Sequence, residues 1–507
     1  MSKFWDFLKG NRLEFVLLAT AMTTSTAVEA IAHPLLLKAL FDEAIIKKSF
    51  HMFVLISLLY LLIAVVLIAW EFFISLWQKR LENRVAQRVS SNLLRTYYDK
   101  DYAHVIEKGE GYFISRIYGD VLEGMVPMVD TLMWFLRNVV RAVSFFGVLV
   151  YLSWEATLLL LILVPPVMYI TSRLTQKIQR LSKAEREAEG KFMDVFVRIV
   201  KSYKVVKIFE LINKVVPIYW GKIGEFLDEN YKTYKSIQIY TWLNYLLMNI
   251  NTTVSMLVSG YMVFIGNLTF GGFLAFTNTF WRAIEAIMGT ISKIGEISRF
   301  LAIISRIDEF KNLESATPPL RGERLTLEGV GFSYGDREVL KDFNLTVNPG
   351  ERVLLTGPNG SGKTTLANIM SGLLKPSRGK VILPEGGISS LTLPVEFPPL
   401  KVRELVKDEE LLERFSLKGL KDKYPHELSA GQKQKLGVAL ALSKRASMYV
   451  LDEPLANVDR ESSTEVMKAI FDRTKGSTLV VIMHRGEEYE SHFDRRVTLE
   501  RNEEVET

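Results

Sequence analysis

The strongest constraint on this 507-residue chain is a series of long apolar runs in its N-terminal part. A bilayer is crossed by about 20 consecutive apolar residues in a helix. Six runs come near or exceed that length: residues 15–37, 53–76, 129–152, 156–171, 240–265 and 271–294. The alternative, a large all-helical soluble core, is disfavoured by unbroken aliphatic stretches such as residues 158–164. The sequence therefore predicts six transmembrane helices.

The connections between these runs differ in charge. Basic residues crowd the two long connections: Lys79, Arg80, Arg84, Arg88 and Arg95 after the second run, and Arg173, Lys177, Arg180, Lys183 and Arg186 after the fourth. The short turns at residues 153–155 and 266–269 carry no Lys or Arg, whereas Lys47 and Lys48 are a mild exception in the first outer loop. The positive-inside rule then predicts a multi-pass protein of the cell membrane (inner or plasma membrane) with both termini in the cytoplasm.

The N-terminal residues allow two interpretations. Lys3 ahead of an apolar run is compatible with a signal peptide, but Glu29 and His33 within that run favour a retained first span. Residues 1–11 mix aromatic and charged side chains, which predicts an amphipathic helix on the surface of the lipid bilayer.

Composition excludes two kinds of site and argues against one kind of partner. The chain has no Cys, so disulfides and Cys-ligated metal sites are excluded. A net charge of +6 is modest and fits cytoplasmic loops near anionic lipid, so we expect no nucleic-acid partner.

The two long connections have helical periodicity and mixed charge. Residues 78–123 and 175–236 are expected to extend the spans into the cytoplasm, with short reversals at residues 99–108 and 202–210. Such reversals would be able to touch the C-terminal half, the alternative being plain solvated hairpins.

Charged residues also occur within or near the predicted spans, where charge is costly. They are Glu71, Asp130, Arg137, Arg141, Arg282 and Glu285. A polar translocation cavity and helix–helix pairing explain them equally well.

A phosphate-binding loop follows the membrane part. Residues 357–364 fit the pattern G-x-x-x-x-G-K-[ST], whose backbone amides wrap nucleotide phosphates. The residues are Gly357, Pro358, Asn359, Gly360, Ser361, Gly362, Lys363 and Thr364. A buried strand at residues 351–356 leads in and a helix at 365–374 leads out, as the motif requires. Lys363 is expected to neutralise the outer phosphates of ATP, and the Thr364 hydroxyl to bind Mg²⁺.

Strands and helices alternate from Leu325 onward, and Ala316-Thr317-Pro318-Pro319 interrupts the preceding helical pattern. We therefore expect a polytopic α-helical membrane domain over residues 1–314 and an α/β P-loop ATPase domain over residues 315–507.

The ATPase half carries further candidates for chemistry. An apolar strand ends at Asp452, placed to hold Mg²⁺ through water, and at Glu453, placed to orient or deprotonate the attacking water. A second buried strand ends at His484, which would contact the γ-phosphate. Tyr334 follows the first strand, where an aromatic ring can stack on adenine.

Leu428-Ser429-Ala430-Gly431-Gln432 precedes a helical run and would form an anion site from helix N-terminal amides and a hydroxyl. One fold does not readily bring this segment and the phosphate loop to one nucleotide. We therefore expect ATP to lie between two such domains.

Together these motifs resemble the ATP-binding cassette (ABC) family, and the whole chain resembles an exporter-type half-transporter. The resemblance implies that residues 357–364, with Thr365, are the Walker A loop and that Tyr334 stacks on adenine. It implies that Ser429, Gly431 and Gln432 belong to the signature that completes the partner's ATP site. It identifies Glu453 as the catalytic carboxylate after the Walker B strand, Asp459 as part of the D-loop and His484 as the switch histidine.

The chain departs from the family pattern in three places. Leu393 stands where the family has a Gln that contacts Mg²⁺, and Ala430 replaces a signature Gly. Residues 424–427 resemble importer ATPases at the position where exporters carry an acidic stretch.

We predict ATP-driven transport by alternating access, in the export direction, of a small-molecule, lipid or peptide substrate. The alternatives are an importer built on the exporter fold and an ATP-sensing regulatory membrane protein without transport. The expected partner is a second half-transporter, and homodimer and heterodimer remain open. Arg137, Arg141 and Arg282 indicate an anionic substrate group only if they face the cavity.

Overall fold

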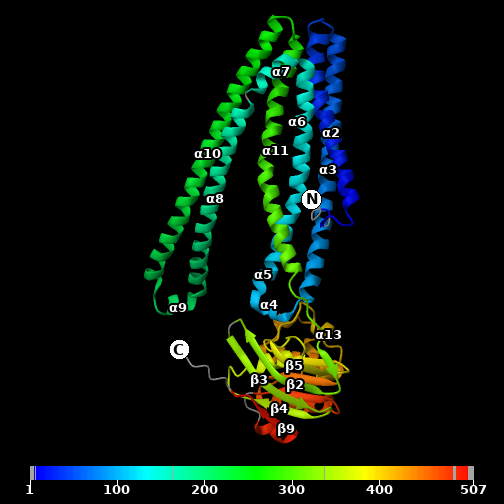
Figure 1. The fold of residues 1–507 in the computed structure, drawn as a ribbon, viewed down its shortest axis with the longest axis vertical. Helices are drawn as coiled ribbons and strands as arrows, with labels where there is room; N and C mark the ends of the chain where they lie inside the picture. The colour runs from blue at the N-terminus through cyan, green and yellow to red at the C-terminus, as the bar shows by residue number, and fades with distance from the viewer. Residues whose placement is uncertain (1–4, 6, 163, 336, 484–486, 501–507) are drawn as a thin grey trace. The chain divides into compact units, whose positions relative to one another are not determined.

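The computed structural model describes residues 5, 7–162, 164–335, 337–483 and 487–500. Contacts within the chain define two compact units (Figure 1). The membrane unit comprises Met1–Ser91 and Tyr118–Ile307, and the ATPase unit comprises Asn92–Ile117 and Asp308–Thr507. Residues 92–117, which lie in the first long basic connection, thus pack with the C-terminal part of the chain.

The N-terminal part of the chain is helical throughout its described length. Its elements are α2 (Arg12–Ala39), η1 (Leu40–Ile45), α3 (Phe50–Tyr98), α4 (Tyr102–Lys108), α5 (Glu110–Ile114), η2 (Ser115–Met125), α6 (Val126–Leu152), α7 (Trp154–Leu161), α8 (Val164–Lys201), α9 (Tyr203–Ile208), α10 (Ile212–Phe264) and α11 (Phe270–Lys311).

Four helical stretches in the described part of the chain are long and apolar enough to cross a membrane. They are Arg12–Ile45, Phe50–Tyr98, Glu110–Leu152 and Ile212–Phe264. They contain the first, second and third predicted spans and all but the last residue of the fifth. The predicted fourth span covers α7 and the start of α8, and the sixth lies within α11, which carries Arg282 and Glu285. The total of six spans therefore stays a prediction.

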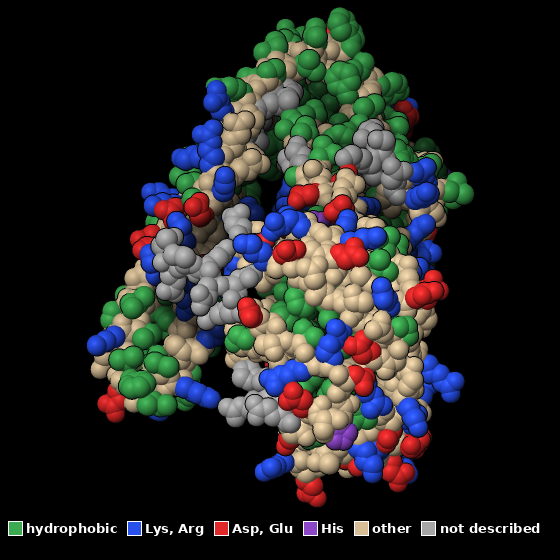
Figure 2. Space-filling view, turned by 60° about the horizontal axis from the view of Figure 1, so that its bottom comes forward, with side chains coloured by type: hydrophobic (Ala, Val, Ile, Leu, Met, Phe, Trp, Pro, Cys, Tyr) green, Lys and Arg blue, Asp and Glu red, His purple; other side chains and the backbone are tan. Residues whose placement is uncertain are grey.

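Apolar side chains of the membrane unit face both inward and outward. Leu18, Met22, Leu81 and Val129 from α2, α3 and α6 form a buried cluster. On α3 the outward side chains are also apolar, and Ile68 is 69% exposed. Figure 2 shows hydrophobic side chains crowding the upper part of this unit. Such an apolar surface is expected where the surrounding medium is lipid rather than water.

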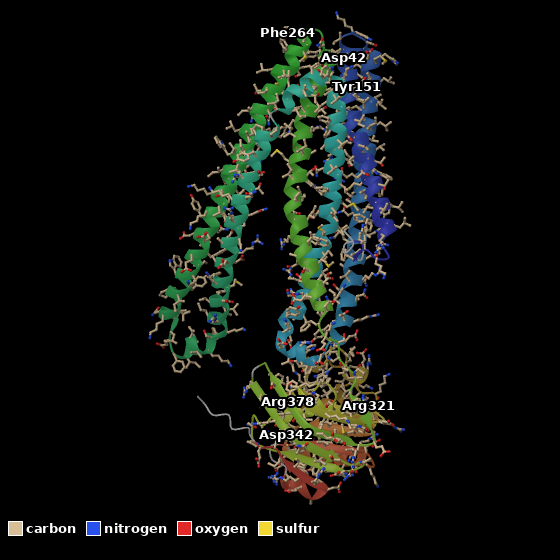
Figure 3. All side chains as sticks on the ribbon, viewed as in Figure 1. Asp42, Tyr151, Phe264, Arg321, Asp342 and Arg378 are labelled. Carbon is tan, nitrogen blue, oxygen red and sulfur yellow. The ribbon has the colours of Figure 1, made fainter. Side chains whose placement is uncertain are left out.

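The end of the unit that carries Asp42 and Phe264 (Figure 3) is held by hydrogen bonds to one carboxylate. Asp42 accepts from the Thr269 hydroxyl at 2.6 Å and from the Gly271 amide at 2.8 Å. A Cβ at Gly271 would collide with the backbone oxygen of Lys38, so the helices approach closely here because residue 271 is Gly.

The C-terminal part alternates strands and helices. Its elements are β1 (Leu320–Gly322), β2 (Leu325–Tyr334), β3 (Arg337–Val347), β4 (Arg352–Thr356), α12 (Lys363–Met370), β5 (Arg378–Pro384), β6 (Ile388–Leu391), α13 (Val402–Leu405), α14 (Glu409–Arg414), η3 (Lys418–Leu420), η4 (Pro425–Glu427), α15 (Ala430–Ser443), β7 (Met448–Asp452), α16 (Arg460–Arg473), β8 (Thr478–Ile482), η5 (Glu487–His492) and β9 (Arg495–Thr498).

Two sheets organise this unit. One is parallel with strand order β6-β7-β8-β4-β9, and the other has order β1-β5-β2-β3 and mostly antiparallel pairing. Side chains of β7 and β8 alternate between two cores, one shared with α12 and one shared with α15 and α16. The parallel sheet is thus covered on both faces, as a sheet of wholly buried strands requires.

The first predicted reversal packs within the ATPase unit. Lys100, only 7% exposed, donates from Nζ to the backbone oxygens of Lys311 and Leu313, at 2.6 and 2.5 Å. The Asp101 amide donates to the Glu314 oxygen at 3.0 Å, and Ala103 of α4 packs against the core that contains α12. This reversal is therefore attached to the ATPase unit rather than being a plain solvated hairpin.

Candidate ATP site and polar membrane cavity

The phosphate-binding loop joins β4 to α12, as the sequence predicts. Gly360 and Gly362 have φ of +81° and +89°, a left-handed conformation that favours Gly. A Cβ at Gly362 would also lie 2.7 Å from Leu340. The Lys363 ammonium group is buried and donates to the backbone oxygens of Gly357 and Pro358, at 2.9 and 2.7 Å. The lysine thus closes the loop on itself.

A buried carboxylate lies beside this loop. Asp452, at the end of β7, is 1% exposed. Burial raises the pKa of the Asp452 carboxyl, and the charge of Glu453 raises it too, whereas a hydrogen bond from Thr364 and the charge of Lys363 oppose this shift. The carboxyl is therefore held in a place where a cation would stabilise its charged form.

The oxygens here suit a magnesium ion. Among the described residues, Asp452 Oδ2 is one of the buried side-chain oxygens without a hydrogen-bond partner. The Thr364 hydroxyl lies beside it as a second oxygen, because it hydrogen-bonds the Asp452 carboxylate. Carboxylate and hydroxyl oxygens are the donors that Mg²⁺ prefers, so the residues present fit this ion.

Glu453 has an unusual backbone. Its φ is +45°, a region that costs a non-glycine residue about 1–3 kcal/mol. Its amide donates to the Ile482 oxygen at 2.9 Å, and its own oxygen accepts from Gln434 Nε2 at 2.9 Å. Neighbouring elements β8 and α15 therefore hold Glu453 at the carboxyl edge of the sheet, the position expected for a group that orients water.

Tyr334 and Thr365 lie together. The Tyr334 hydroxyl is 3.5 Å from the Thr365 hydroxyl, and its ring meets Phe332 edge-on with 4.9 Å between centroids. Tyr334 is half-buried at the end of β2, so one side of its ring packs on the core. His484 lies outside the described residues.

The signature segment begins α15 through reciprocal hydrogen bonds. The Ser429 hydroxyl accepts from the Gln432 amide at 3.3 Å, and Gln432 Oε1 accepts from the Ser429 amide at 3.0 Å. A Cβ at Gly431 would lie 2.6 Å from the Asn457 oxygen, so Gly is required where the signature meets the D-loop. Ser429 and Ala430 are exposed. The start of α15 is therefore fixed by its capping hydrogen bonds and is exposed to solvent.

Asp459 of the D-loop caps a helix. Its carboxylate accepts from the Ser462 amide at 2.8 Å at the start of α16. Hydrogen bonding to Ser462 lowers the pKa of Asp459, so the carboxyl stays ionised there.

The Walker A and signature helices lie on opposite faces of the parallel sheet. Leu366 and Ile369 of α12 share a core with Val450 and Ile482, whereas Leu436 and Val438 of α15 pack in the other core. The structure thus brings the phosphate loop, Asp452 and Thr364 together, but places Ser429 and Gly431 across the sheet from α12.

Two further residues make contacts that the sequence does not predict. Gln434 donates to the Glu453 carbonyl, and Lys100, just before α4, donates to the last residue of α11 and to Leu313 beyond it. Gln434 lies only two residues beyond the signature segment, and its 4% exposure is visible only after folding. Lys100 acts on residues more than two hundred positions away, for which the sequence has no local signal.

The charged residues predicted within or near the spans form ion pairs, line a cavity, or do both. Arg137 pairs with Glu71, Arg141 Nη2 lies 3.1 Å from Glu29 Oε2, and Asp130 accepts from Gln78 at 3.0 Å. Arg282 and Glu285 instead line a cavity of about 710 Å³, which also reaches Glu29 and Arg141. Both explanations from the sequence, helix pairing and a polar cavity, therefore hold, and Arg141 shows both because it pairs with Glu29 and lines the cavity.

Comparisons with known proteins match both units. The family model described as ABC transporter transmembrane region matches residues 16–284, and the model described as ABC transporter matches residues 340–456. An ATP-dependent lipid A-core flippase of Burkholderia pseudomallei is 27% identical, covering 100% of this chain and 92% of the relative. An ABC-type oligopeptide transporter of Homo sapiens is 24% identical, covering 79% of this chain and 58% of the relative.

The fold has a solved counterpart. A bacterial Atm1-family ABC exporter with ATP bound superimposes with a TM-score of 0.76 at 16% identity, covering 98% of this chain and 95% of that chain. Because the membrane-region model alone spans residues 16–284 of 507, this chain belongs to the ABC transporter family, as an exporter-type half-transporter with both regions in one polypeptide.

Proposed function

We propose that this chain is one half of a dimeric exporter that moves an amphiphilic molecule out of the cytoplasm. Membership of the family supports ATP hydrolysis coupled to transport across a membrane by an exporter fold. The observation that carries the proposal is that one chain has both a strained Glu453, next to Asp452, and a cavity lined by acidic and basic side chains among its long apolar helices.

In the ATPase unit each residue has one proposed role. Lys363 leaves the loop carbonyls to contact the β- and γ-phosphates, and Glu453 orients and deprotonates the attacking water. Thr364 and Asp452 would hold Mg²⁺, which would supply positive charge next to the phosphates. His484 contacts the γ-phosphate, and Tyr334 stacks on adenine.

The opposite placement of α12 and α15 supports a dimer. One chain presents a phosphate loop on one face of its parallel sheet and a signature on the other. Two chains facing each other would complete each ATP site with Ser429 and Gly431 of the other, and Asp459 would lie at their contact. Homodimer and heterodimer both fit this arrangement.

The second reversal supports the same assembly. Around α9, Tyr203, Ile208 and Phe209 are 68%, 72% and 67% exposed, and Figure 2 shows green side chains at the lower tip of the left-hand hairpin. An exposed apolar group of this kind marks a contact surface. Because α4 packs on the ATPase core of its own chain, we assign α9 to the ATPase unit of the second subunit.

The orientation follows from charge. Lys and Arg are concentrated in the connections that contain α4 and α9, so these connections and the ATPase unit would lie in the cytoplasm. We therefore propose the inner or plasma membrane as the location of the protein, where ATP would reach its site directly.

Transport in sealed vesicles tests the proposal. The purified chain is reconstituted so that the ATPase unit faces outward, and ATP is added outside. Export predicts that a labelled lipid or peptide accumulates in the vesicle lumen or lumenal leaflet, and that Glu453→Gln abolishes accumulation. Glu461→Gln, an exposed change on α16, is the matched control.

Other outcomes identify the alternatives. ATP-dependent loss of substrate from preloaded vesicles would indicate an importer. ATPase activity without movement of any substrate would favour a regulatory protein. An inactive purified monomer would indicate an obligate, different partner chain.

A further inference from the structure

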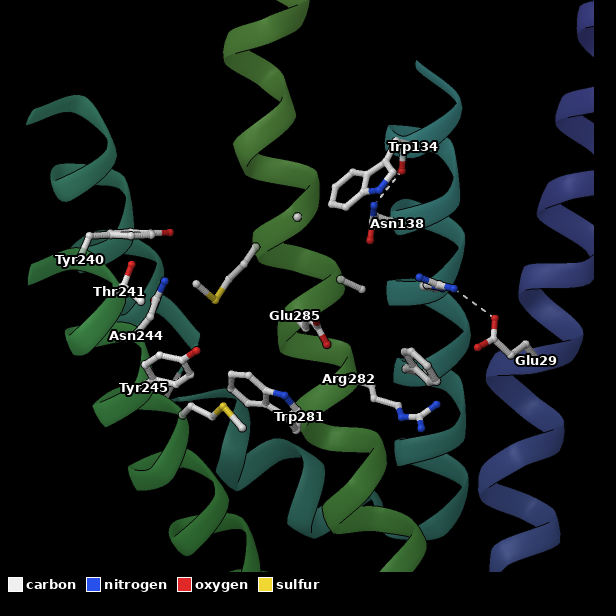
Figure 4. Close-up of a pocket in the computed structure, with 16 residues that line it drawn as sticks. Glu29, Trp134, Asn138, Tyr240, Thr241, Asn244, Tyr245, Trp281, Arg282 and Glu285 are labelled. Atoms are coloured by element: carbon white, nitrogen blue, oxygen red, sulfur yellow. Dashed lines mark hydrogen bonds and ion pairs between the residues drawn. The ribbon is translucent and has the colours of Figure 1, made fainter. Parts of the chain in front are cut away.

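The cavity of about 710 Å³ is built from four helices of the membrane unit, α2, α6, α10 and α11 (Figure 4). Its volume lies within the range of small-molecule sites, about 300–1,000 Å³. Among the described residues that line it, four are charged, two acidic and two basic: Glu29, Glu285, Arg141 and Arg282. As one subunit's share of a translocation path, the cavity therefore carries no net charge.

The four charges are not equivalent. Glu29 and Arg141 neutralise each other across α2 and α6 at 3.1 Å. Within the described part of the chain, Arg282 and Glu285 have no hydrogen bond or ion pair to any side chain. They lie three residues apart on α11, so they share one face of that helix and both line the cavity (Figure 4).

Water can solvate both groups while the cavity is open. A bound ligand that displaces this water must replace its hydrogen bonds, because a charge left unpaired in an apolar site is costly. A purely anionic ligand would satisfy Arg282 and bring like charge to Glu285. A purely cationic ligand would satisfy Glu285 and bring like charge to Arg282.

The remaining wall offers apolar surface and polar rims. Trp134, Tyr240, Tyr245 and Trp281 contribute aromatic rings, and Asn244 contributes an amide. Aromatic faces attract ammonium groups as well as hydrocarbon. The ligand that fits this wall has an apolar body and a small charged head.

We infer that the cavity selects a zwitterionic amphiphile, with its ammonium group against Glu285 and the aromatic rings and its phosphate or carboxylate against Arg282. This rests on the proposed transport function and replaces the anionic substrate suggested by three arginines in the sequence. Arg137 does not line this cavity and pairs with Glu71, while Arg141 is neutralised by Glu29. A phosphoethanolamine lipid and an apolar peptide with free termini share the inferred chemistry.

Binding to the full-length, nucleotide-free protein in phosphatidylglycerol nanodiscs tests the inference. The probes are a tail-labelled short-chain phosphoethanolamine lipid, its N-acetylated anionic analogue, a trimethylammonium amphiphile of equal chain length, and an apolar tripeptide with free or blocked termini. We expect the lipid or the free tripeptide to bind at least about tenfold more tightly than its singly charged or blocked counterparts. If the lipid shows this preference, the ligand is a zwitterionic lipid; if the free tripeptide shows it, the ligand is a peptide.

Variants of the two residues should move the preference in opposite directions. Glu285→Gln should remove the advantage of the zwitterion over the anion, and Arg282→Gln its advantage over the cation. The exchange Arg282→Glu with Glu285→Arg keeps both charges and should retain the preference for a zwitterion. Arg180→Gln and Glu189→Gln, exposed changes on α8, should alter nothing.

Three results would overturn the inference: equal binding of the anionic analogue, a Glu285→Gln variant with unchanged preference, or no binding of either zwitterion. Its failure is distinguishable from failure of the proposed function. Glu453-dependent transport without head-group preference would refute only the charge selectivity. Glu453-dependent ATPase activity without any transport would refute the function itself.

Discussion

The ATPase unit and the membrane unit hold their charged side chains in different ways. In the ATPase unit, Asp452 and Lys363 are held by hydroxyl and backbone oxygens of nearby loops. In the membrane unit, Arg141 and Arg137 are neutralised by Glu29 and Glu71, which come from other helices distant in sequence.

The difference reflects the ligand that each unit receives. A phosphate loop binds one fixed chemical group, so backbone groups and a short motif suffice. The membrane unit has no comparable loop, and a charged side chain that water does not reach there needs a partner from another helix, because lipid supplies none. Local motifs therefore identify the first site, and only tertiary contacts identify the second.

The largest effect should come from Glu453→Gln. If local motif geometry governs the ATPase unit, loss of the water-orienting carboxylate lowers ATP hydrolysis by at least about 100-fold. Steady-state phosphate release measures it, with Glu461→Gln as control. Hydrolysis near the parent rate would show that the strained carboxylate is not the catalytic group.

Gln434→Leu should have the next largest effect. The change leaves the Glu453 carbonyl without its 2.9 Å partner and lets the strained backbone relax. We expect turnover to fall about tenfold with the KM for ATP little changed, because the phosphate loop is untouched. Lys433→Gln, one position earlier, is the control, and a parallel change in KM would place the residue in ATP binding.

A double-mutant cycle at Glu29 and Arg141 tests pairing in the membrane unit. Both side chains are about one-third exposed, so the expected coupling free energy is modest, about 1 kcal/mol. Thermal unfolding of Glu29→Gln, Arg141→Gln and the double variant in detergent gives the value. Additive effects would mean that the pair does not stabilise the unit.

The smallest effect concerns pH and Asp452. Burial raises the pKa of the Asp452 carboxyl above its ordinary value of 3.8, so the folded state holds this proton more tightly than the unfolded chain. Its contribution to stability is full below 3.8 and is lost as pH rises through the raised pKa. Asp452→Asn should therefore make the nucleotide-free protein less sensitive to rising pH and more stable at neutrality.

Asp472 provides a control of opposite sign. A hydrogen bond from Arg414 lowers the pKa of the Asp472 carboxyl, so its contribution is present above 3.8 and is lost as pH falls through the lowered pKa. Unfolding of both Asn variants across a pH series checks the two signs together. Identical slopes would contradict the burial of Asp452.

Most of the ATPase site could be predicted from sequence. The loop, Asp452 and Glu453 follow from motifs whose residues adjoin their strands. The role of Gln434 could not, because one buried amide among several Gln residues has no distinguishing pattern. In the membrane unit the apolar runs predicted helices, but the partners of Arg137 and Arg141 lie on α3 and α2.

By itself the sequence determined the two-part organisation, the ATP-binding motifs and the long membrane helices, because periodicity and short motifs are local properties of the chain. Only the tertiary structure decided that α12 and α15 lie on opposite faces of one sheet and that the reversal containing α4 packs in the ATPase unit. It also decided that Arg137 and Arg141 have acidic partners, whereas Arg282 and Glu285 line the cavity. These features depend on contacts between residues far apart in the chain, and such contacts leave no local pattern in the sequence.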